Sequence, residues 1–152
     1  MNSNPSPLAP ANDPAVTSHI SLLQAIINRL ANNSASCKTW CLTLVSALLS
    51  LSGATKNPAI ATAALIPVVI FCFVDVMYLA QEKAYRALYN DVVTAIRNGS
   101  YGPGRVFDAK ATRTSGHIWA ALQSWSIWPI YGGLIAAYIL AQSLGWLDRL
   151  AK

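Results

Sequence analysis

The sequence predicts an all-α integral membrane protein: a helical bundle with about three transmembrane helices, one of which extends as a long helix into the cytoplasm. Of its 152 residues, 54% are hydrophobic and only 11% are charged, and the mean hydropathy is +0.39. Soluble globular domains carry about a quarter charged residues. So little charge argues against a soluble monomer, and so much hydrophobicity argues against a disordered chain.

The N-terminal region predicts a tail followed by a surface helix. Residues 1–17 contain four prolines and no apolar periodicity, so we expect a disordered tail that lacks the pattern of a signal peptide. Residues 18–34 predict an amphipathic helix, with a stripe at helical spacing over 18–31 and a break at Asn32-Asn33-Ser34. This helix is too short and polar to span, and it either lies on the membrane surface or packs against a partner.

A membrane domain is expected over residues 39–147, with spans at 39–54, 58–80 and 127–147. The second span has no helix breaker after it until Asn98-Gly99, so the helix should continue from Pro58 to Asn98, with a kink at Pro67. At 1.5 Å per residue this helix measures about 60 Å, twice the thickness of a bilayer core. About half of it should therefore project into water.

The charge distribution predicts the orientation. Segment 82–117, which contains the helical extension and a basic loop, carries six cations against three carboxylates and should be cytoplasmic. The N-terminus then lies on the same side and the C-terminus outside. Residues 117–128 are Trp-rich, as expected at the headgroup level, and if this segment or 18–31 spans the bilayer, one terminus changes side.

One face of the long helix combines carboxylates and aromatic rings at three- and four-residue spacing. An intramembrane carboxylate is costly, so Asp75 should face protein or water. It either belongs to a gate or ion path, or forms a stabilising hydrogen bond to a neighbouring helix. The gate or helix-seam candidates are Asp75, Tyr78, Glu82, Tyr85, Arg86 and Tyr89.

Two further groups of residues have candidate roles. Cations and an aromatic ring around a Gly-rich loop are expected either to set topology only or to bind a polyanion, whether lipid headgroups or a nucleotide. These residues are Arg97, Tyr101, Arg105, Lys110 and Arg113. In the third span, small residues predict close helix packing, within the chain or between chains: Gly132, Gly133, Ala136 and Ala137.

No catalytic or cofactor motif is present in the sequence. His19 and His117 lie far from the three cysteines, so metal-ligand spacing is absent, and we expect no metal and no cofactor. Neither histidine has a recognisable nucleophile or carboxylate partner, and we expect that the protein is not an enzyme.

The run FCFVDVMYLAQEKAYRALYNDVV, residues 71–93, resembles a pattern in small bacterial membrane proteins. The layout is similar to SLATT-type membrane effectors of bacterial antiphage systems, with the Hailong-type effector nearest. The resemblance covers Asp75, Tyr78, Glu82, Tyr85, Arg86 and Tyr89, and Ala80 and Ala84 replace the bulkier groups expected in this pattern.

This resemblance implies a homo-oligomeric pore that depolarises the bacterial inner membrane in antiphage defence. Its partners would be membrane lipids, further copies of itself (with a tetramer as one option), and a nucleotide or oligonucleotide made by a neighbouring enzyme. The alternative is a non-conducting membrane anchor or scaffold that recruits a soluble partner through residues 82–117.

Overall fold

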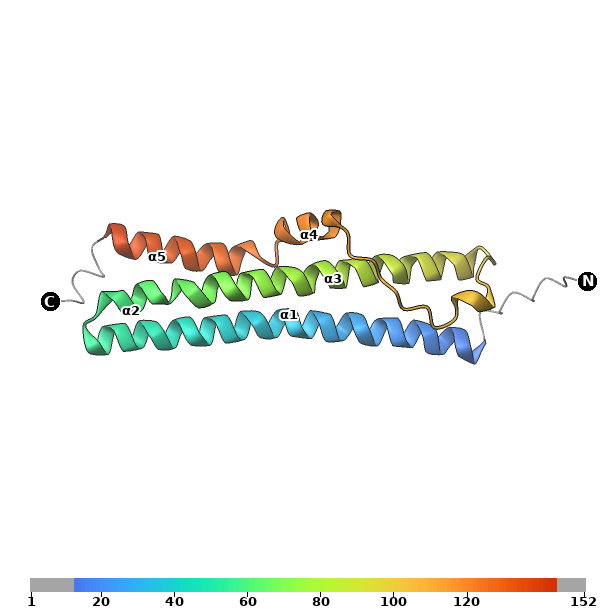
Figure 1. Cartoon of the computed structure of the whole chain (residues 1–152), viewed down its shortest axis with the longest axis horizontal. Helices are drawn as coiled ribbons and strands as arrows, with labels where there is room; N and C mark the ends of the chain where they lie inside the picture. The colour runs from blue at the N-terminus through green and yellow to red at the C-terminus, as the bar shows by residue number, and fades with distance from the viewer. Residues whose placement is uncertain (1–12, 145–152) are drawn as a thin grey trace, which may run out of the picture.

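The computed structural model describes residues 13–144, which form helices and connections and contain no strand. The all-α prediction is therefore confirmed over this range. The elements are α1 (Pro14–Thr55), α2 (Pro58–Ala63), α3 (Leu65–Arg97), the short turn η1 (Pro103–Arg105), α4 (Ser115–Leu122), the π-helical turn η2 (Trp128–Gly132) and α5 (Gly133–Ser143). Together they form an elongated rod, in which α1 and the α2–α3 pair run antiparallel along its length (Figure 1).

Helix α1 is one continuous helix from Pro14 to Thr55, where the sequence predicted two separate helices. It begins at Pro14 rather than Ser18, because Asp13 caps it: the Asp13 Oδ1 accepts a hydrogen bond of 2.8 Å from the Ala15 N–H. It also continues through Asn32-Asn33-Ser34, so the predicted break is wrong.

The reason for this continuity is packing. The buried residues of α1 recur every three or four positions on both sides of Asn32 and Asn33, and so form one unbroken stripe against α3. Tertiary burial outweighs the weak helix propensity of the two asparagines. The stripe comprises Val16, His19, Leu23, Ile27, Leu30, Ser34, Cys37, Cys41 and Val45.

The two long helices are connected by a tight turn. Lys56 ends α1 in the left-handed conformation with φ 52°, and the Ser52 hydroxyl donates a 2.8 Å hydrogen bond to the Asn57 carbonyl. The Asn57 side chain accepts from the Ala59 N–H at 3.1 Å and caps α2, which starts at Pro58.

The long helix expected after Pro58 is present, but it has an interruption at Ala64. This interruption lies about one turn before Pro67, the position at which a kink was expected. Pro67 lacks the N–H that would bond to the Ala63 carbonyl, and its ring crowds that carbonyl, so the helix is disturbed on the N-terminal side of the proline. Helix α3 then runs without further interruption to Arg97, one residue short of the expected end.

Two alanines lie on the buried face of α3. Ala80 and Ala84, which the resemblance to SLATT-type effectors would fill with bulkier groups, are 0% and 3% exposed. Small side chains let helix axes approach closely. Ala80 and Ala84 therefore lie on the buried, helix-packing face of α3.

The rod divides into an apolar half and a polar half. The apolar half contains residues 39–55 of α1, 58–74 of α2 and α3, and 128–144; among them no Asp, Glu, Lys or Arg occurs. Of the large hydrophobic side chains exposed in the described range, only Leu22 and Phe107 lie in the polar half, made of residues 14–37, 76–97 and 98–114. Two helical stretches, Pro14–Thr55 and Pro58–Arg97, are long and apolar enough to cross a membrane.

The third expected span is only partly represented. Ile127–Leu147 begins with the π turn η2, its α-helix α5 ends at Ser143, and Trp146 and Leu147 lie outside the described residues. Helix α5 lies beside α2 at one end of the rod (Figure 1), and the Tyr138 hydroxyl is 3.0 Å from the Thr62 Oγ1. None of its residues is fully buried.

The burial pattern of α1 predicts a sharp difference between two neighbouring leucines. Leu23 is 0% exposed and packs with Val92 and Tyr101, whereas Leu22 is 40% exposed. Leu23→Ala should cost about 2–5 kcal/mol because it leaves a cavity, whereas Leu22→Ala should cost under about 1 kcal/mol. Thermal unfolding of the detergent-solubilised protein measures this, and equal melting temperatures for the two variants would contradict the packing of α1 on α3.

Candidate functional site

An ion pair lies where the apolar and polar halves of the rod meet. Lys38 is the last charged residue of α1 before the charge-free stretch, and Asp75 is the first charged residue of α3 after it. The two residues are equally far from the turn between the helices, 17 positions before Thr55 and 17 after Pro58. Because both helices rise about 1.5 Å per residue, the antiparallel arrangement brings them to the same level.

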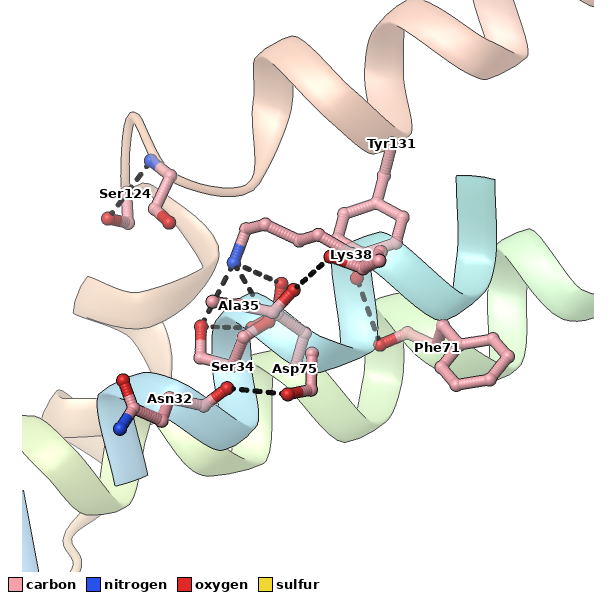
Figure 2. Close-up of polar contacts among 11 residues, drawn as sticks. Asn32, Ser34, Ala35, Lys38, Phe71, Asp75, Ser124 and Tyr131 are labelled. Carbon is pink, nitrogen blue, oxygen red and sulfur yellow. Dashed lines mark hydrogen bonds and ion pairs between the residues drawn. The ribbon is translucent and has the colours of Figure 1, made fainter. Parts of the chain in front are cut away.

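Three side chains from two helices converge at this point (Figure 2). The Lys38 Nζ lies 2.6 Å from the Asp75 Oδ2, and the Ser34 hydroxyl donates a 2.5 Å hydrogen bond to the Asp75 Oδ1. The Lys38 ammonium also donates to the Ser34 Oγ at 2.9 Å. Ser34 and Lys38 are four residues apart and so share one face of α1.

The Asp75 carboxylate is completely buried, whereas the Lys38 side chain is 13% exposed. Oδ2 has no hydrogen-bond partner of suitable geometry among the described residues, and the Lys38 ammonium is its charge partner. Burying such a pair costs desolvation energy that roughly cancels its attraction, and removing one partner is strongly destabilising. The paired state is therefore stable, whereas a state in which either charge is buried without its partner is high in free energy.

Tyr131 reaches this site from η2 (Figure 2). Its ring is 2% exposed, its hydroxyl donates to the Phe71 carbonyl at 3.3 Å, and it interacts electrostatically with Asp75. The site thus joins all three segments of the apolar half: α1 through Lys38, α3 through Asp75, and the third segment through Tyr131.

Asp75 forms a hydrogen bond to a neighbouring helix, as one of the two interpretations expects, and the neighbour is α1 of the same chain. Sequence analysis did not identify this partner, because Lys38 lies 37 positions before Asp75 in the chain. The signal was available: Ser34, Cys37 and Cys41 continue the apolar stripe at three- and four-residue steps, with Lys38 beside them.

The other gate candidates lie along α3 in the polar half. Glu82 is buried and accepts a 2.7 Å hydrogen bond from the Nε of Arg86, four residues further along α3. The Tyr89 hydroxyl accepts from the Gln24 side chain at 3.2 Å, so it too faces α1. Tyr78 and Tyr85 are half-buried.

The five polyanion candidates do not form one cluster. Arg97, Lys110 and Arg113 are exposed, and the Arg105 Nη1 lies 3.4 Å from the Asp91 Oδ2. Tyr101, by contrast, is 1% exposed and is part of the core. The cations are therefore accessible to a ligand, whereas the Tyr101 ring is not available for stacking.

Tyr101 instead belongs to a buried polar contact that holds the loop onto α1. Its hydroxyl lies 2.6 Å from the Nδ1 of His19, which is 0% exposed, and the His19 Nε2 lies 3.1 Å from the Asp108 carbonyl. Because that carbonyl can only accept, the Nε2 carries a proton. Burial raises the pKa of the Tyr101 hydroxyl above its usual value. Sequence analysis assigned no role to His19, because its partners Tyr101 and Asp108 are 82 and 89 residues away.

The small residues of the third segment have different surroundings. A side chain on Gly132 would approach the Trp128 ring within 3.2 Å, so Gly132 makes room for that ring, whereas Gly133 faces open space. Ala136 is exposed, and Ala137 lines a small apolar cavity of about 120 Å³ between α1, α2 and α5. Ala137 thus lines a space that α5 shares with the neighbouring helices, whereas a Cβ on Gly133 would meet nothing within 4 Å.

In the described part of the chain, no group of three His, Cys, Asp or Glu side chains is placed to hold a metal ion. The three cysteines are free thiols, of which Cys37 and Cys41 are buried. No known protein family, characterised protein or solved structure with which the chain was compared matches it. The geometry of the site is thus the basis for any functional interpretation.

The Lys38–Asp75 geometry predicts strong coupling between the two residues. Lys38→Met should destabilise the protein by about 3–5 kcal/mol because it leaves a buried carboxylate unpaired. Lys38→Met combined with Asp75→Leu should recover most of that loss. A double-mutant cycle on melting in detergent measures the coupling, with exposed Lys110→Met as the control for loss of a lysine; additive effects would contradict the pairing.

Proposed function

We propose that this chain is an integral protein of the bacterial inner membrane that spans the bilayer three times, with the polar half of the rod in the cytoplasm. Three observations support this placement. Each segment of the apolar half contains about 17 residues without charge and so measures about 25 Å, close to the bilayer core. Its large side chains are exposed, and cations collect in the polar half, as on cytoplasmic segments.

Exposed tryptophans support the same placement. Trp40, Trp119, Trp125 and Trp128 are each more than 60% exposed and lie near the junction of the two halves. Indole rings favour the headgroup level of a bilayer. In this orientation α4 lies along the cytoplasmic interface instead of spanning, and the segment 18–31 is the cytoplasmic start of α1.

We further propose that several copies assemble into a gated ion-conducting pore that depolarises the membrane. The observation that carries this proposal is the buried Lys38–Asp75 pair at the cytoplasmic mouth of the apolar half. While the pair is closed, two charges neutralise each other within the chain. When it opens, a carboxylate and an ammonium are freed at the membrane boundary, where they favour a water-filled path between copies.

The gate would respond to a ligand in the cytoplasm. A nucleotide or oligonucleotide that binds the exposed cations Arg97, Arg105 and Lys110 would open the pair only if it binds the open form more tightly than the closed form. The loop that carries Arg105 and Lys110 is attached to the start of α1 through His19, and α1 also carries Lys38 of the ion pair. The resemblance to SLATT-type effectors supports a role in antiphage defence, with the ligand made by a neighbouring enzyme.

A non-conducting membrane anchor is the second candidate, and one observation favours it. Asp75 and Tyr89 make polar contacts with α1, and Glu82 pairs with Arg86 on α3 itself, so all three side chains have their partners within the chain. In that case the polar half would recruit a soluble partner, and no current would flow.

The pore proposal predicts that Asp75→Ala changes ion flow and leaves assembly intact. Removing the carboxylate leaves Lys38 without its partner, so depolarisation in cells expressing the protein should change by several-fold, as measured with a voltage-sensitive dye. Cross-linking in membranes monitors the oligomer, and Asp91→Ala, an exposed carboxylate outside the pair, is the matched control. An unchanged potential with an intact oligomer would favour the anchor.

The ligand proposal predicts that charge reversal weakens nucleotide binding. Arg105→Glu combined with Lys110→Glu replaces two cations by two carboxylates and should weaken binding of an oligonucleotide by at least tenfold, because each lost charge contact to phosphate is worth about 1 kcal/mol or more. Equilibrium binding of a labelled oligonucleotide measures the change, with Lys83→Glu as a matched reversal outside the loop. Binding that survives the reversal would leave these cations as determinants of topology alone.

A further inference from the structure

An open groove of about 360 Å³ lies on α3 at the junction of the two halves. Phe73, Met77 and Leu30 supply its apolar surface, and Tyr78, Gln81 and Arg113 supply polar groups. Arg113 is exposed, contacts no carboxylate within residues 13–144, and is the one charged residue that lines the groove. The groove therefore combines an apolar wall with a single, uncompensated positive charge.

A second groove of about 330 Å³ adjoins the first and shares Phe73 and Met77 with it. Its lining is entirely apolar: it extends along α3 from Val68 to Met77 and is bounded by Ile118 and Leu122 of α4 and by Ile135 of α5. The nine residue steps from Val68 to Met77 correspond to about 14 Å, close to half of a bilayer's hydrocarbon core.

The polarity of the two grooves changes in one direction along α3. From Val68 to Met77 the surface is apolar, and from Tyr78 to Gln81 it offers a hydroxyl, an amide and the Arg113 guanidinium. A phospholipid has the same gradient, with an acyl chain joined to a phosphate. In the proposed orientation the polar end lies at the cytoplasmic headgroup level, near the exposed Trp119.

We propose that these adjoining grooves bind one anionic phospholipid of the cytoplasmic leaflet. Its phosphate pairs with Arg113, Tyr78 and Gln81 donate hydrogen bonds to the headgroup, and one acyl chain lies against α3 between Val68 and Met77. Arginine suits this role because its guanidinium donates two parallel hydrogen bonds to phosphate oxygens. A soluble nucleotide lacks the acyl chain that the second groove would hold.

The bound lipid would have a structural consequence for the gate. It would contact α1 through Leu30, the connection before α4 through Arg113, and α5 through Ile135. These elements surround the level of Asp75, so the lipid would hold the segments around the ion pair together. This inference rests on the membrane placement in the proposed function, and not on conduction.

Native mass spectrometry of the full chain in detergent, titrated with phosphatidylglycerol or with phosphatidylcholine of the same acyl chains, tests the proposal. Wild type should retain one tightly bound lipid per chain and prefer phosphatidylglycerol several-fold. Arg113→Gln should weaken phosphatidylglycerol binding about tenfold and remove the preference. The control Arg29→Gln removes the same charge from an exposed position of α1 outside both grooves and should leave binding unchanged.

A second variant tests the acyl part. Val69 lines the second groove, so Val69→Trp should fill it and weaken both lipids alike, whereas Leu42→Trp, on an exposed surface outside both grooves, should have no effect. Phosphatidylglycerol binding unchanged in both Arg113→Gln and Val69→Trp would overturn the proposal. Displacement of the lipid by glycerol 3-phosphate would also overturn it, because the site would then be one for soluble phosphate.

Flotation of the expressed protein with membranes after carbonate treatment separates the two levels of failure. A chain that is extracted by carbonate is not embedded in the bilayer, and the proposed function then fails together with this inference. A chain that stays embedded but does not distinguish the lipids refutes the lipid site alone.

Discussion

The buried core and the candidate site both depend on the antiparallel contact between α1 and α3. Neither helix can bury its apolar stripe alone, and only their pairing places Ser34 and Lys38 opposite Asp75. The charged pair in turn fixes the axial register. Sliding one helix by a single turn would move the partners apart by about 5 Å and leave a buried carboxylate without compensation, so hydrophobic burial supplies the stability and the ion pair selects one alignment.

Much of the fold follows from composition and periodicity alone. The all-α class, the long helix after Pro58 and the Glu82–Arg86 pair were all predictable, because each depends on local spacing. The continuity of α1 was not predicted, since a local break signal at Asn32 and Asn33 competes with a stripe whose value appears only against α3. The stripe from Leu23 to Cys41 follows one 3.5-residue repeat, and this repeat predicts a helix that continues through the asparagines.

The candidate site shows the same division between local and distant information. The sequence identified Asp75 by the cost of a carboxylate in an apolar run, but Lys38, Ser34 and Tyr131 approach it from other parts of the chain. Tyr101 was expected on a ligand surface because of its basic neighbours, yet it is buried against His19. Residue type and spacing indicate that a group needs a partner; only tertiary topology identifies the partner.

Helix α5 has no fully buried residue, although its companions α1 and α3 each have many. In the proposed placement, lipid acyl chains surround α5 on most sides. Its position then depends on bilayer thickness and lateral pressure as much as on side-chain contacts. A thinner or more fluid bilayer would tilt α5 and, through Tyr131 at its base, pull on the surroundings of Asp75. A change in bilayer thickness or fluidity would thus change the electrostatic environment of the Asp75 carboxylate.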